Sequence, residues 1–110
     1  PANISGNLIN PRVRVFALKS VIGVNEPQTV FVIAQDQYLR AVEGAQVGVT
    51  LFLPDGRQEF YRLPETNEYG ISQFTFTTAD LPVRSVVNII TEINIRGEHG
   101  SGRSWFRIWW

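Results

Sequence analysis

The feature that most constrains this chain is a long run at residues 86–96 in which apolar and polar side chains alternate. A period of two places successive side chains on opposite faces of a β-strand. One face of this run is built from Val87, Ile89, Thr91, Ile93 and Ile95, and the other from Asn88, Ile90, Glu92, Asn94 and Arg96. Shorter alternating runs recur along the chain between Gly- and Pro-containing breaks, so the sequence predicts an all-β fold.

Composition supports this prediction and excludes a parallel α/β sheet. Twelve Val, ten Ile and seven Thr stand against seven Leu, six Ala and one Lys, and branching at Cβ favours strands over helices. Seven strands in about 100 residues are typical of an immunoglobulin-like (Ig-like) antiparallel β-sandwich. The expected strands cover residues 12–18, 28–36, 45–53, 57–63, 71–78, 86–96 and 103–110. The expected core consists of Val30, Val32, Ala34, Val47, Val49, Leu51, Phe74, Phe76, Ile89 and Ile93.

Length and charge bound the organisation and the partners. The 110 residues fit one domain, which we expect at 12–110 after a linker or entering segment at 1–11 that is rich in Asn, Gly, Ser and Pro. A chain that begins at Pro1 is interpreted as a segment of a larger protein. Its zero net charge argues against nucleic acid as a partner, and no run of apolar residues is long enough for membrane insertion.

Four short motifs add a resemblance to known families. They are Val30-x-Val32-x-Ala34-x-Asp36, Val42-x-Gly44-Ala45-x-Val47-x-Val49, Pro54-Asp55-Gly56 and Thr66-x-x-x-Gly70-x-x-x-Phe74. The succession resembles the bacterial Ig-like domains of surface proteins and invasin-type stalks, and it is also similar to macroglobulin-like modules.

The resemblance implies architectural roles and no shared activity. It implies that Asp36 closes the second strand, that Gly44 and Ala45 lead into the third, and that Thr66 and Gly70 frame the turn into the fifth. Turn chemistry itself predicts a positive φ at Gly56 and at Gly70.

No catalytic constellation is expected. The one histidine, His99, lies in a glycine-rich stretch at 97–102 that we interpret as a hairpin loop, and the Ser101 beside it has no strained elbow or oxyanion hole. There is no cysteine, and no cofactor is expected. A calcium ion held by Asp36 with Glu43 or Asp80 is a less favoured alternative, because calcium needs several oxygen ligands.

The C-terminal aromatic residues form the candidate interaction surface. Strand alternation places Phe106 and Ile108 inward and Trp105, Arg107 and Trp109 outward, and Trp110 completes the candidate set of Trp105, Arg107, Trp109 and Trp110. Exposed rings of this kind either pack against a neighbouring domain or another protein, or stack on sugar rings.

The sequence therefore predicts a non-enzymatic Ig-like structural or interaction module from a larger exported or cell-surface protein, located outside the cell or in its envelope. A carbohydrate-binding β-sandwich that uses surface tryptophans is the alternative.

Overall fold

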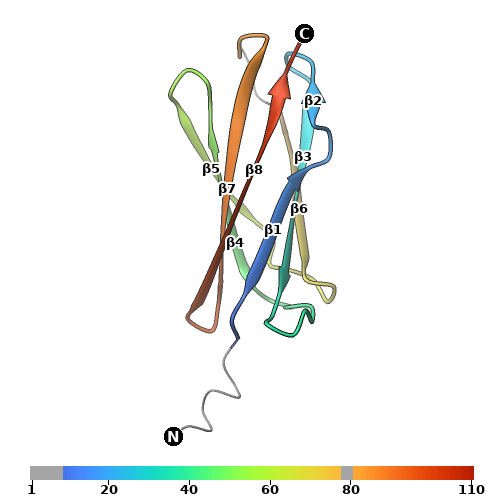
Figure 1. Cartoon of the computed structure of the whole chain (residues 1–110), viewed down its shortest axis with the longest axis vertical. Helices are drawn as coiled ribbons and strands as arrows, with labels where there is room; N and C mark the ends of the chain where they lie inside the picture. The colour runs from blue at the N-terminus through green and yellow to red at the C-terminus, as the bar shows by residue number, and fades with distance from the viewer. Residues whose placement is uncertain (1–8, 78–80) are drawn as a thin grey trace, which may run out of the picture.

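A computed structural model describes residues 9–77 and 81–110, and within these residues the fold is all-β (Figure 1). The strands are β1 (Arg12–Ala17), β2 (Val21–Ile22), β3 (Pro27–Gln35), β4 (Gln46–Phe52), β5 (Gln58–Leu63), β6 (Ile71–Thr77), β7 (Ser85–Ile95) and β8 (Glu98–Ile108). None of the described residues belongs to a helix that could cross a membrane.

The strands form two sheets that pack face to face, as Figure 1 shows. The smaller sheet has the order β1-β3-β6, and the larger has the order β2-β8-β7-β4-β5. All seven predicted strands are present, so the prediction of an all-β sandwich is confirmed.

One strand departs from the prediction. The short β2 pairs in parallel with β8, Val21 opposite Arg107 and Ile22 opposite Ile108, so the sandwich is not wholly antiparallel. The two residues of β2 lie between Ser20 and Gly23 in a segment whose local signals are those of a connection. Their pairing depends on a strand more than eighty positions later in the chain, which local pattern does not reveal.

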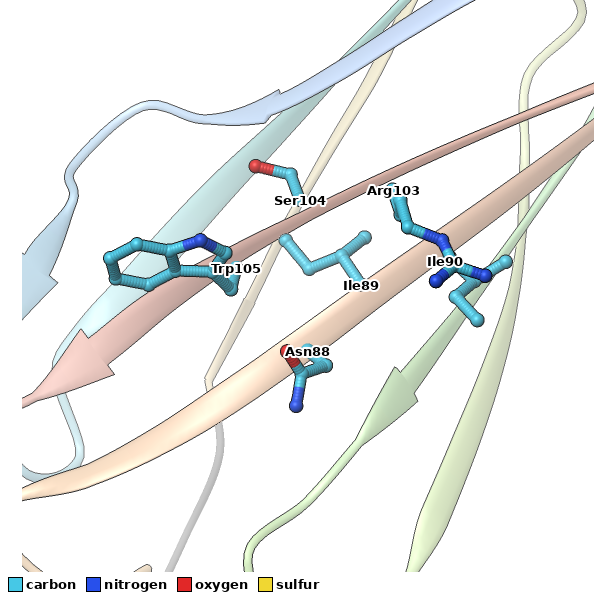
Figure 2. A pocket seen from close by; sticks show the side chains of 6 residues that line it. All are labelled: Asn88, Ile89, Ile90, Arg103, Ser104 and Trp105. Carbon is cyan, nitrogen blue, oxygen red and sulfur yellow. The ribbon is translucent and has the colours of Figure 1, made fainter.

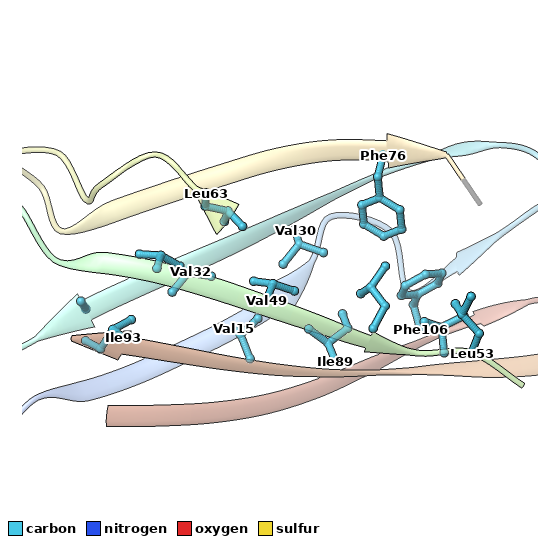
Figure 3. Close-up of a cluster of buried hydrophobic side chains, with 14 of the residues drawn as sticks. Val15, Val30, Val32, Val49, Leu53, Leu63, Phe76, Ile89, Ile93 and Phe106 are labelled. Atoms are coloured by element: carbon cyan, nitrogen blue, oxygen red, sulfur yellow. The ribbon is translucent and has the colours of Figure 1, made fainter. Parts of the chain in front are cut away.

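The core lies between the sheets and is built from inward-facing aliphatic side chains (Figure 3). Nine of the ten predicted core residues are buried, and the tenth, Phe74, is only partly buried. Phe74 lies on β6, the edge strand of the smaller sheet. There it joins a run of ring contacts with Tyr61, Phe76 and, through Phe76, Phe106. Edge position, and not a wrong register, explains its exposure.

The prediction of a hairpin loop at 97–102 is wrong for most of that stretch. The hairpin turn consists only of Arg96 and Gly97, both with positive φ, and β8 already begins at Glu98. Gly100 and Gly102 lie inside β8, where β1 passes close by (Figure 1). A Cβ on Gly100 would lie 2.8 Å from Val13 Cγ2, and one on Gly102 would lie 3.1 Å from the Val13 carbonyl oxygen. The glycines therefore permit close approach of a second strand, which is a further reason for glycine in a strand.

We expect Gly100→Val to lower the free energy of unfolding by about 1–3 kcal/mol, because the added side chain meets Val13 and the Pro11 carbonyl. Ser101→Val is the matched control, since Ser101 is exposed on the same strand and valine suits an exposed strand position. Urea unfolding of both variants measures the difference. Equal stability of the two variants would contradict the close packing of β1 on β8.

The positions that carry the family resemblance hold loops together. Gly56 and Gly70 have φ values of +92° and +75°, as predicted. The Thr66 hydroxyl donates to the Val42 carbonyl at 2.6 Å and accepts from the Ala45 N–H at 2.9 Å. Thr66 is 3% exposed, so these bonds tie the β3–β4 connection to the β5–β6 connection away from water.

Candidate functional site

The candidate site is the outer face of the larger sheet around β8. Trp105 is 50% exposed, whereas Phe106 is fully buried and Ile108 is 1% exposed. This pattern confirms the predicted register of the last strand. Arg103 and Arg107 occupy the outward positions on either side of Trp105, and both are exposed.

Trp109 extends the same face beyond the end of β8. Its backbone N–H donates to the Ile22 carbonyl at 3.0 Å, which continues the β2–β8 pairing, and its side chain is 49% exposed. Two arginines lie on these rings. The Arg107 guanidinium carbon is 5.2 Å from the Trp105 ring centroid, and that of Arg84 is 5.7 Å from the Trp109 centroid. Cation–π contacts of this kind hold the rings without covering them.

Trp110 lies apart from the other two tryptophans. Because it follows Trp109 directly, its side chain points to the opposite side, the side of Phe106 and Ile108. Its indole lies against Gly23, where an added Cβ would be 2.7 Å from the indole Nε1. Of the four predicted surface residues, Arg107 and Trp105 are in contact, and Trp109 follows on the same face by strand alternation. Trp110 is 65% exposed but has the opposite parity.

Strand pairing adds residues that the sequence did not single out. In β7, Asn88 lies opposite Trp105, and Ile90 lies opposite Arg103. Further across the sheet, the Phe60 ring on β5 lies over Gly48 of β4, where an added Cβ would be 2.9 Å from the ring. Phe60 is 61% exposed, and the Arg62 guanidinium lies 5.9 Å from its centroid. These partners come from strands β4, β5 and β7, so only the three-dimensional register joins them to Trp105.

The face carries excess positive charge. Its outward arginines on β5 and β8 are Arg62, Arg103 and Arg107, and Glu92 is the one carboxylate residue at an outward position of β4, β5, β7 or β8. None of the three ion pairs formed among the described residues involves these arginines.

The face is open and carries shallow grooves. A shallow groove lies beside Trp105, lined by Asn88, Ile90 and Arg103 among others, as Figure 2 shows. Its volume of about 190 Å³ is below the roughly 300–1,000 Å³ of pockets that enclose small molecules. A surface of this shape suits an extended partner that lies across it.

The position of His99 differs from the prediction. His99 lies on β8 and not in a loop, exposed and opposite Asn94. The described residues contain no group of three or more His, Asp or Glu placed to hold a metal ion.

The carboxylate of Asp36 is engaged by its own turn. It accepts the backbone N–H groups of Tyr38 and Arg40 at 2.8 and 3.0 Å, and it pairs with the Arg40 side chain at 3.0 Å. These donors occupy the oxygens that the calcium alternative would use. Of its two possible partners in that alternative, Glu43 is exposed and Asp80 lies outside the described residues.

The Asp36 contacts predict a pH dependence. The backbone N–H of Arg40 is the largest cause that lowers the pKa of Asp36 below its ordinary value of 3.8, with help from Tyr38 and the Arg40 guanidinium. A lowered folded-state pKa means that the ionised group stabilises the fold above the unfolded pKa and loses that effect as pH falls through the folded pKa. We expect Asp36→Asn to be less stable than wild type above about pH 4 and to approach it in more acidic buffer. Thermal unfolding across a pH series measures this, and a pH-independent difference would contradict it.

No known protein family matches the sequence, and no curated protein is similar to it. Among solved structures, the chain is similar to Spo0M, a sporulation control protein from Bacillus subtilis, with a TM-score of 0.48 and 15% sequence identity. The similarity covers 93% of this chain and 49% of the Spo0M chain. The chain thus spans about half the length of that structure.

Proposed function

We propose that this chain is an Ig-like module. The sheet orders β1-β3-β6 and β8-β7-β4 correspond to the strand orders A-B-E and G-F-C of Ig sandwiches. The position of β5 beside β4 is that of the extra strand that variable-type domains add to the G-F-C sheet. The four motifs that resemble bacterial Ig-like domains lie on the loops and strands that make this arrangement.

The proposed function is non-enzymatic binding, as a structural or interaction module of a larger exported or cell-surface protein. Its partner is a neighbouring domain of the same polypeptide or another protein. The observation that carries this proposal is the open face on which Trp105 and Trp109 are each about half exposed beside arginines. Aromatic residues and arginine are the side chains that most often dominate binding energy at protein interfaces.

Carbohydrate binding is the second candidate, and one observation favours it. The groove beside Trp105 is lined by Asn88 and Arg103, which offer hydrogen bonds next to an exposed ring. An apolar ring with a polar fringe is the arrangement on which a sugar ring stacks.

The proposal predicts separate effects on binding and on stability. We expect Trp105→Ala to weaken association through this face by tenfold or more, because large aromatic anchors dominate such contacts. The free energy of unfolding should fall by less than about 1 kcal/mol, since the ring is half exposed. Tyr69→Ala is the control, because Tyr69 is 68% exposed on the loop before β6.

Three measurements separate the candidates. Sedimentation of the chain reports a second copy, limited proteolysis of the longer protein reports a neighbouring domain, and affinity electrophoresis in polysaccharide gels reports sugar. Loss of a protein contact in Trp105→Ala alone supports the first candidate, and loss of polysaccharide retention supports the second. If Trp105→Ala behaves like Tyr69→Ala in all three, the proposed face binds neither a second copy, nor the neighbouring domain, nor the polysaccharides tested.

A further inference from the structure

The charges of this chain are unevenly distributed. Ten basic and ten acidic residues balance over the whole sequence. The outward positions of β4, β5, β7 and β8, however, carry three arginines and one glutamate, which is an excess of two positive charges. The ion pairs of the described residues lie elsewhere, at Lys19–Glu26, Arg40–Asp36 and Arg57–Asp55. The aromatic face is thus cationic, and none of its guanidinium groups is in an ion pair among the described residues.

Two of these guanidinium groups lie on the strand positions to either side of Trp105. Arg103, Trp105 and Arg107 are alternate residues of one strand, so their Cα atoms follow one another at about 7 Å intervals on the same face. Arg107 lies on the Trp105 ring at 5.2 Å, yet Trp105 stays half exposed. A ligand ring stacked on the exposed part of the Trp105 indole would therefore have the Arg103 guanidinium on one side along the strand and the Arg107 guanidinium on the other.

Uncharged hydrogen-bonding side chains fill much of the remaining face. Asn88 lies beside Trp105, and Asn94, Gln46 and Ser101 occupy outward positions further along the sheet. Amides and hydroxyls both donate and accept, which matches the hydroxyl groups of a sugar. These side chains therefore offer a sugar hydrogen-bond partners beside the exposed ring of Trp105.

We propose that this face binds a carboxylated polysaccharide, a polymer of uronic acid units, whose rings stack on Trp105 and whose carboxylates pair with Arg103 and Arg107. This inference rests on the second candidate function, carbohydrate binding, because it names the class of sugar for the same face. Guanidinium groups bind carboxylates in a bidentate geometry. Neutral polysaccharides have no carboxylate, so the face should bind them more weakly.

The test compares polygalacturonate with its methyl-esterified form, which has the same sugar backbone without the charge. Affinity electrophoresis gives the dissociation constant in each gel. We expect the wild-type chain to bind polygalacturonate, to bind the ester at least tenfold more weakly, and to lose affinity between about 0.1 M and about 1 M salt as the charges are screened.

The arginine variants locate the charge effect. Arg103→Gln and Arg107→Gln should each raise the dissociation constant for polygalacturonate about tenfold, the effect of losing one charged hydrogen-bonded contact. Arg14→Gln removes the same charge from an exposed position on β1 of the smaller sheet, and it should change the constant by less than about twofold. Circular dichroism of each variant shows that the fold is retained.

The other outcomes overturn the inference in distinguishable ways. Equal binding of both polymers that depends on Trp105 overturns the carboxylate selectivity and leaves carbohydrate binding standing. Equal retention by polyglutamate, with the same dependence on Arg103 and Arg107, shows that charge alone decides and removes the sugar. Binding of no polysaccharide, with a protein contact that Trp105→Ala abolishes, overturns the inference while the proposed function stands. If neither Trp105 nor the arginines affect any interaction, both proposals fall.

Discussion

Phe106→Ala should lower the free energy of unfolding by about 3–5 kcal/mol. The side chain is fully buried and lies 6.0 Å, centroid to centroid, from the ring of Phe76 on the opposite sheet. Removal of the ring leaves a cavity between the two layers, because the aliphatic side chains around it come from several strands and collapse only in part. Urea unfolding followed by far-ultraviolet circular dichroism measures the loss.

Trp105 provides the matched control for this substitution, since it is the preceding residue on the same strand. Trp105→Ala removes a larger ring yet should cost less than about 1 kcal/mol, because half of the side chain already meets water. The opposite order of effects, with Trp105→Ala the more destabilising, would show that the register of β8 is shifted by one residue.

Among the described glycines, Gly70→Ala should be the most damaging alanine substitution, with a loss of about 2–4 kcal/mol. Gly70 has a φ of +75°, and a Cβ there would lie 2.4 Å from the Ala34 carbonyl oxygen and 3.2 Å from the Val42 nitrogen. Both neighbours are backbone atoms that are already hydrogen-bonded, because Ala34 donates to the Gly70 carbonyl at 2.8 Å and accepts from Val42 at 3.0 Å. The clash can be relieved only by separating these paired segments.

Gly56→Ala isolates the conformational part of that effect. Gly56 also has a positive φ, +92°, but no atom lies within 4 Å of its Cβ direction. Its substitution should cost about 1 kcal/mol. Calorimetry of both variants gives the comparison, and equal losses at the two positions would contradict the close approach at Gly70.

Periodicity predicted the strands because most of them bury one face and expose the other. The inward set of β7 and the inward Phe106 and Ile108 of β8 follow from alternation alone. The same rule predicts that Trp105 lies on the outer face.

The glycines at 97–102 did not reveal from sequence whether they form a turn or allow a second strand to approach. Gly97 permits a turn, whereas Gly100 and Gly102 permit the approach of β1, and three glycines in six residues look alike in both cases. The approach of β1 to β8 involves segments about 90 positions apart, so no local signal separates the two roles.

The candidate site was predictable only in its β8 part. Trp105 and Arg107 lie on one strand, whereas Asn88, Phe60 and Arg62 reach the same face from β7 and β5. Which strands are neighbours depends on sheet order, and the absence of ion pairs at Arg103 and Arg107 among the described residues depends on where every carboxylate lies. The cationic character of the face is therefore a property of the fold.

The indole N–H signals of Trp105, Trp109 and Trp110 provide the most direct test of the central claim that the outer face around β8 is the binding surface. Each signal can be assigned by single substitution and followed by nuclear magnetic resonance during titration with a short oligogalacturonate. Binding on the proposed face should shift the Trp105 signal most and the Trp109 signal next. The Trp110 signal should stay nearly fixed, because that ring, although 65% exposed, has the parity opposite to Trp105 and Trp109 and lies against Gly23. A saturable titration that shifts Trp110 alone, or one that leaves both Trp105 and Trp109 in place, would contradict the account.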